Sequence, residues 1–125
     1  MILTKQQEET VASVIPAFNM LKKLRKANIT RAKEWNQGTK APISFAFMEL
    51  AGEVGEACNA GKKLARQEMG WKGGETDLTN LIEELADVVI CVDLVAMEYN
   101  IDLSKAIRDK FNKTSKKHGF KTMLK

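Results

Sequence analysis

The sequence predicts an all-α protein with four main helices. Only 2 of its 125 residues are proline, 8 are glycine, and aromatic residues make up 6%. Residues with high helix propensity, above all alanine, leucine, lysine and glutamate, are common. Apolar residues recur at helical spacing in long segments, whereas no segment keeps the alternation typical of a strand. We therefore expect residues 1–125 to form a single domain resembling a four-helix bundle.

The first predicted helix begins directly after Thr4 and ends near Trp35. Thr4 is followed three residues later by Gln7, which is the pattern of a capping box at the start of a helix. Pro16 lies inside this segment, where proline removes a hydrogen bond and clashes with the preceding turn. We therefore expect a break or kink near Val14–Pro16.

Three further helices are expected at about residues 44–66, 78–99 and 102–117, with loops that contain glycine or proline before the first two. The helix at 78–99 is apolar nearly all round, which is typical of a buried helix. A polar residue precedes or begins each helix and is expected to cap it. These residues are Ser44, then Thr76 or Asp77, then Asp102 or Ser104. Gly119 is expected to end the last helix.

The net charge, the hydropathy and the cysteine spacing limit the classes of protein to which the sequence can belong. The formal net charge is +4, and much of the positive charge lies in residues 105–125. Such a tail can contact nucleic acid, ligand phosphates or only water. No apolar run is long enough to span a membrane, and the start of the chain lacks a signal-peptide layout, so we expect a cytoplasmic protein. Cys58 and Cys91 lack C-x-x-C spacing and are predicted to be buried free thiols.

Two of the predicted helices each carry a pair of carboxylates. Glu53 and Glu56 lie three residues apart in one helix, and Glu84 and Asp87 lie three residues apart in the next. This spacing places each pair on one helix face. The second pair lies among apolar residues, where a carboxylate is unfavourable unless it is paired or binds a metal. One such pair is commonly a solvated face, but two on adjacent helices favour a shared site.

Four oxygen ligands without a histidine suit a hard cation, so Mg²⁺ is the expected metal and Mn²⁺ its substitute. A di-iron bundle would need Glu-x-x-His pairs. The single histidine, His118, follows Ser115 at that spacing, which disfavours iron. Glu49 and Glu83 are candidates to support the ligands from a second layer. For both, an exposed helix charge is the open alternative.

This arrangement resembles the signature of the all-α nucleoside triphosphate pyrophosphohydrolases, which include MazG, the dimeric dUTPases and the dCTP pyrophosphatases. The carboxylate pairs are separated by 27 residues. The segment LAGEVGEACNA resembles the MazG-type helix L-x-E-E-x-G-E, although Gly52 stands where many members have a second glutamate. The segment RDKFNKTSKKHGF resembles the later K-x-x-x-N-type segment of the family. The resemblance covers roughly residues 30–120.

The resemblance implies that a nucleoside triphosphate is hydrolysed between its α- and β-phosphates to the monophosphate and pyrophosphate. Glu53, Glu56, Glu84 and Asp87 would hold Mg²⁺ and be the catalytic residues. Bound cations would let a polyanion approach the carboxylates and would acidify the attacking water. The resemblance also implies a role in controlling a deoxynucleotide pool and a homo-oligomer, with a tetramer favoured over a dimer. The base is not readable from the sequence, and a purine such as dGTP is a preference without residue-level support.

Four residues are candidates for substrate contacts: Asn112, Lys110, Lys116 and Trp35. Asn112 lies in the segment that resembles the family, and the two lysines have a spacing that suits phosphates. Trp35 can stack on a base. A solvated surface role for each lysine and a packing role for the tryptophan stay open.

Two other functions are compatible with the sequence. One is an inactive helical interaction module. The other is a basic nucleic-acid-binding protein, which is disfavoured because the acidic stripe would repel phosphate without a metal.

Overall fold

The computed structural model of the chain describes residues 4–125, with the side chains of all of them except residues 8–19. This part of the chain folds into four α-helices and no strand, so the predicted all-α fold is confirmed there. The helices are α1 (Lys5–Asn36), α2 (Ile43–Glu68), α3 (Leu78–Glu98) and α4 (Leu103–Lys117).

Side-chain caps begin three of the helices, as the sequence predicts. Thr4 and Gln7 form the capping box at the start of α1. Asp77 accepts a hydrogen bond from the backbone N–H of Thr79 at 2.9 Å, and Asp102 accepts one from Lys105 at 3.0 Å. These caps satisfy N–H groups that have no partner within the helix.

The predicted cap at Ser44 is wrong. The residue that precedes α2 is Pro42, with φ −66° and ψ 148°, and no side chain caps the helix. The proline ring holds φ near its fixed value at this position. Its carbonyl oxygen already accepts a hydrogen bond from the backbone N–H of Phe45 at 2.9 Å. Helix α2 therefore begins before Ser44, which lies inside it.

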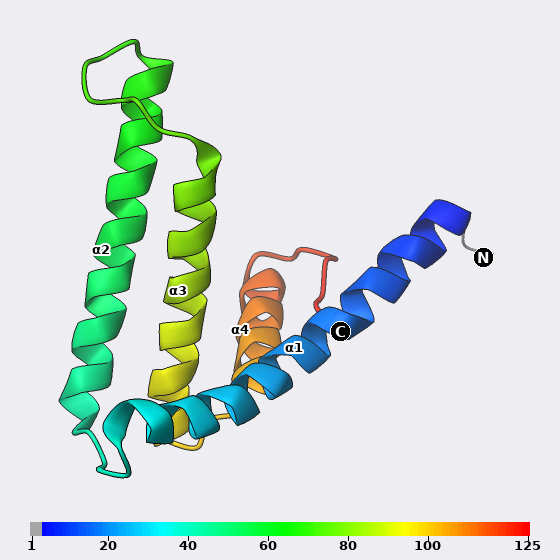
Figure 1. The fold of residues 1–125 in the computed structure, drawn as a ribbon. Coiled ribbons are helices and arrows are strands. Elements are labelled where there is room, and N and C mark those ends of the chain that lie inside the picture. The colour runs from blue at the N-terminus through cyan, green and yellow to red at the C-terminus, as the bar shows by residue number, and fades with distance from the viewer. Residues whose placement is uncertain (1–3) are drawn as a thin grey trace.

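The predicted break near Val14–Pro16 is also wrong, because α1 runs from Lys5 to Asn36 as one helix. The φ angle that proline imposes is close to the helical value, so the ring removes a hydrogen bond without requiring the helix to stop. Figure 1 shows the first half of α1 extending away from the other helices. The surroundings of the Pro16 side chain, and with them the predicted kink, lie outside the described residues.

Helices α2 and α3 form an antiparallel hairpin, and their contact is the most extensive between any two helices (Figure 1). Helix α1 crosses α3, and α4 packs against α1. The buried apolar side chains are small: Ala57, Ala60, Cys91 and Ala96. Small side chains let two helix axes approach closely. The hairpin therefore brings the backbones of α2 and α3 near each other.

The loop between α2 and α3 is pressed against the end of α2. Gly70 adopts a left-handed φ of 67°, and the N–H of Trp71 donates to the carbonyl of Arg66 at 2.8 Å. Gly74 is buried, and a Cβ added to it would lie 2.4 Å from the backbone nitrogen of Gln67. Only glycine fits this close approach, which sets the path that leads into α3.

The expectation that α3 is a buried helix holds for one of its faces only. Ile82, Leu85 and Val89 are 58%, 52% and 48% exposed. They lie at helical spacing, three and four residues apart, so they share one face of α3. Within the described part of the chain this apolar face has no covering helix.

A buried polar network joins α1 to α3. Asp93 and Asn28 are each 1% exposed. Arg25 forms an ion pair with Asp93, with Nη2 2.9 Å from Oδ1, and also donates to the carbonyl oxygen of Ile101 at 2.8 Å. The Asn28 amide donates to Asp93 Oδ2 at 3.0 Å. This network was not expected from the sequence, and it supplies charged and hydrogen-bonding partners to the buried carboxylate of Asp93.

We expect Asp93→Ala to reduce the free energy of unfolding by roughly 3 kcal/mol, because breaking one partner of a buried pair leaves the other charge and its amide neighbour unpaired. Chemical denaturation followed by circular dichroism would measure this change.

The matched control is Asp109→Ala. Asp109 pairs with Lys105 on the exposed side of α4, and the hydrogen bond from that lysine lowers the pKa of the Asp109 carboxyl. Exposed pairs contribute little to stability. An equal loss in both variants would contradict the proposed importance of the network.

Candidate metal centre

Three of the four predicted carboxylates meet between α2 and α3. Glu53 lies on α2, and Glu84 and Asp87 lie one turn apart on α3. One carboxylate oxygen from each lies within 4.8 Å of the other two. The close contact of the helix backbones brings these three side chains together.

Glu56 lies beside this group without belonging to it. Its side chain is exposed, and its charge raises the pKa of both Glu53 and Glu84 through repulsion. Glu49 also raises the pKa of Glu53 through repulsion. Glu83 is exposed and is not among the charges that raise the pKa of Glu53 or Glu84, so its predicted supporting role gains nothing from the geometry.

The carboxylates disfavour one another's ionised form. Partial burial raises the pKa of Glu53 above its ordinary value, followed in size by repulsion from Glu56, Asp87 and Glu49. The pKa of Glu84 is raised by burial first, then by the charge of Glu56 and their hydrogen bond. A carboxyl whose pKa is higher in the folded state than in the unfolded state lowers the free energy of unfolding when it is ionised at neutral pH.

Two oxygen atoms of this cluster lack any partner. Oε2 of Glu53 and Oε2 of Glu84 are buried, and neither has a hydrogen-bond partner among the described residues. A buried carboxylate oxygen without a donor is unfavourable unless a cation neutralises it. A hard divalent ion that takes oxygen ligands would bind both atoms and reduce the repulsion. The residues present therefore fit a Mg²⁺ or Mn²⁺ ion.

The sequence of this chain matches a known protein family. A model of the MazG nucleotide pyrophosphohydrolase domain matches residues 45–120. The chain belongs to the MazG family. The match spans α2, α3 and α4 and includes all four predicted ligands. No curated protein and no solved structure matched the chain.

The fold of one chain separates the predicted substrate residues from the carboxylates. Trp35, at the end of α1, is 79% exposed. Lys110 and Lys116 are exposed on α4, and Asn112 on the same helix is half-buried. Helix α4 packs against α1, whereas the carboxylates lie between α2 and α3. Within one chain, the structure does not bring these two groups of residues together.

The two cysteines of the MazG domain differ in exposure to solvent. The prediction that both are buried is wrong for Cys58. That side chain is exposed, and Cys91 is buried. Burial raises the pKa of the Cys91 thiol to about 11, and repulsion from Glu49, Glu53 and Asp87 adds to the shift. A thiol with this pKa stays protonated at neutral pH and is a poor ligand or nucleophile.

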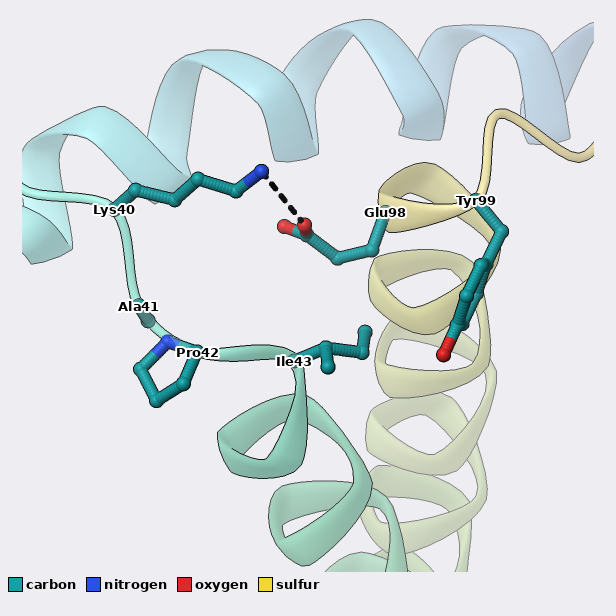
Figure 2. Close-up of a pocket in the computed structure, with 6 residues that line it drawn as sticks. All are labelled: Lys40, Ala41, Pro42, Ile43, Glu98 and Tyr99. Atoms are coloured by element: carbon teal, nitrogen blue, oxygen red, sulfur yellow. Dashed lines mark ion pairs between the residues drawn. The ribbon is translucent and has the colours of Figure 1, made fainter.

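A cavity of about 480 Å³ lies apart from the carboxylates, where the loop between α1 and α2 meets the end of α3. Figure 2 shows Lys40 and Glu98 facing each other across it, with Nζ and Oε2 3.7 Å apart. Tyr99 lies on one side, with Pro42 and Ile43 on another (Figure 2). Sequence reasoning did not predict this cavity, and none of the predicted site residues lines it.

No described helix of the MazG domain has the length and apolar character needed to cross a membrane.

We expect Glu53→Gln to raise the melting temperature of the metal-free protein by several degrees, because it removes a charge that the cluster disfavours. Addition of Mg²⁺ should stabilise the unaltered protein by an amount that grows with the logarithm of one plus the ratio of the Mg²⁺ concentration to Kd, and should stabilise the variant much less. Thermal melts with EDTA and over a Mg²⁺ series would measure both effects.

Glu83→Gln is the matched control, because its exposed charge lies next to Glu84 in sequence but outside the cluster. If Glu83→Gln and Glu53→Gln changed the Mg²⁺ response equally, the assignment of Glu53 as a ligand would be wrong.

Proposed function

We propose that the chain is a Mg²⁺-dependent nucleoside triphosphate pyrophosphohydrolase that cleaves between the α- and β-phosphates. The observation that carries the proposal is the convergence of Glu53, Glu84 and Asp87 with two buried oxygen atoms that have no partner. Membership of the MazG family supports the same reaction class. A deoxynucleoside triphosphate is the favoured substrate, and control of a deoxynucleotide pool is the favoured role.

We assign different roles to the four carboxylates according to their positions. Glu53, Glu84 and Asp87 are close enough together to hold a cation, which would supply charge neutralisation for the phosphates and a water of lowered pKa. Glu56 is exposed at the edge of this group and is the carboxylate best placed to accept a proton from the attacking water. Asn112, Lys110 and Lys116 would bind the phosphates, and Trp35 the base.

This division of residues requires more than one copy of the chain. Helix α4 is separated from the carboxylates in the same chain, so its basic residues would reach the cluster of a second copy. The exposed apolar face of α3 supports such an assembly, because apolar surface of this kind is stable when another helix covers it. We propose a homo-oligomer and favour a tetramer over a dimer.

Light scattering coupled to size exclusion should give a mass of about four times the 14.0 kDa of one chain. Leu85→Lys places a charge on the exposed apolar face of α3 and should reduce that mass while helical content is kept. A monomer at micromolar concentration in the unaltered protein would contradict the proposed assembly.

The reaction is tested with a panel of deoxynucleoside and nucleoside triphosphates in the presence of Mg²⁺. Pyrophosphate and a nucleoside monophosphate should be released in equal amounts, and EDTA should abolish the reaction. Glu53→Gln and Asp87→Asn should each lower kcat by about a hundredfold or more, because each removes a charge that holds the cation.

The control for these variants is again Glu83→Gln, which should keep kcat within about twofold, because the charge is exposed outside the cluster. Release of orthophosphate with a diphosphate product would refute cleavage between the α- and β-phosphates. Full activity in Asp87→Asn would refute the metal-ligand assignment.

A further inference from the structure

The chain that follows α4 turns back along that helix. Helix α4 ends at Lys117, and Gly119 adopts a left-handed φ of 68°. The N–H of Phe120 then donates to the carbonyl oxygen of Ser115 at 2.8 Å, which closes the reversal. Figure 1 shows this last stretch leading away from the end of α4 toward α1. We refer to residues 120–124 as the return segment.

The return segment is held by the side chain of Asn112. Asn112 Nδ2 donates to the carbonyl oxygen of Leu124 at 2.8 Å, and the N–H of Leu124 donates to Asn112 Oδ1 at 2.6 Å. A backbone N–H can only donate and a carbonyl oxygen can only accept. The opposite orientation of the amide would place donor against donor and acceptor against acceptor. Leu124 therefore fixes which edge of the Asn112 amide carries the oxygen.

This fixed orientation leaves a donor available. A carboxamide has two N–H groups and one oxygen. Leu124 takes the oxygen and one N–H, and no other hydrogen bond of Asn112 is found among the described residues. A phosphate oxygen is an acceptor, so it is attracted to an N–H and repelled by a carboxamide oxygen. With the oxygen engaged by Leu124, the second N–H of Asn112 is the group that remains for an acceptor.

The surroundings of Asn112 favour an anion. Residues 103–125 contain eight lysine or arginine side chains and one acidic side chain, Asp109. Asp109 pairs with Lys105 and Arg108, whereas Lys110, Lys113 and Lys116 are exposed and have no ion pair among the described residues. An excess of unpaired positive charge attracts phosphate groups.

We propose that the return segment is part of the nucleotide site, with Leu124 as the positioning residue that presents Asn112 to the substrate as a hydrogen-bond donor to a phosphate oxygen. The inference rests on the proposed function, because it assigns a role to Asn112 within that site. Leu124 acts through Asn112 and does not itself touch the nucleotide. The segment stays in place when substrate binds.

The test compares two substitutions of Leu124 in the full chain. Leu124→Pro removes the N–H that engages Asn112 Oδ1 and keeps every lysine in place. Leu124→Ala shortens the side chain and keeps both backbone hydrogen bonds. Leu124→Pro should raise KM for the triphosphate about tenfold. Without the Leu124 N–H, the Asn112 amide can rotate and present its oxygen to the phosphate in place of its N–H. Leu124→Ala should raise KM far less than Leu124→Pro does, because both hydrogen bonds to Asn112 are kept.

The kinetic pattern separates positioning from a structural role. A segment that only stabilised α4 would lower the folded fraction in Leu124→Pro, which reduces the apparent kcat and leaves KM unchanged. An unchanged KM in Leu124→Pro, with activity in the unaltered protein, overturns this inference and leaves the proposed function intact. Failure of the unaltered protein to release pyrophosphate from any nucleotide refutes both.

A second measurement on the unaltered protein does not depend on how the variant folds. With Mg²⁺ and a non-hydrolysable deoxynucleoside triphosphate analogue, the side-chain amide signals of Asn112 should shift in a ¹⁵N spectrum. The N–H of Leu124 should stay protected from hydrogen exchange. Loss of that protection on binding would mean that the nucleotide displaces the return segment, which overturns the inference.

Discussion

The arrangement of the helices depends on one buried carboxylate, Asp93. A carboxylate with 1% exposure is stable only with charged or hydrogen-bonding partners, and Arg25 and Asn28 of α1 supply them. Glu84 lies nine residues before Asp93, which places it about 180° around the axis of α3. When Asp93 faces α1, Glu84 must therefore face away from α1. The ion pair thus sets the rotation of α3 that presents its other carboxylates to α2.

The close contact between α2 and α3 depends on small buried side chains. Ala57, Ala60 and Cys91 are buried, whereas large apolar side chains such as Leu85 and Val89 stay exposed. Small residues contribute little apolar burial but let the backbones approach, and that approach brings Glu53 to within 4.8 Å of the carboxylates on α3. Exposed apolar surface is the consequence, and it is the physical basis for the proposed assembly.

Helix periodicity and residue spacing were sufficient to predict the four helices and to place each carboxylate pair on one helix face, because both depend on local geometry. The approach of Glu53 to Glu84 and Asp87, with Glu56 outside the group, depends on how α2 packs against α3, which residue spacing does not determine. The start of α2 differs from the prediction because Ser44 is a strong capping residue, whereas the fixed φ of Pro42 lets the helix begin earlier, at Ile43. The network around Asp93 was missed, although an acidic residue within the apolar run CVDLV is itself a signal of a buried pair. The partner of Asn112 could not be predicted, because no periodicity relates α4 to the irregular segment after it.

The carboxylates between α2 and α3 lie together although each disfavours the ionised form of its neighbours. Partial burial and mutual repulsion raise the pKa values of Glu53 and Glu84, and two buried oxygens have no donor. A fold selected only for stability would place glutamine or alanine at these positions, since neutral side chains remove the repulsion at no cost to the helices. A close helix contact and an ion pair on the opposite face of α3 hold these unfavourable charges together, which is the preorganisation that the proposed cation site would need.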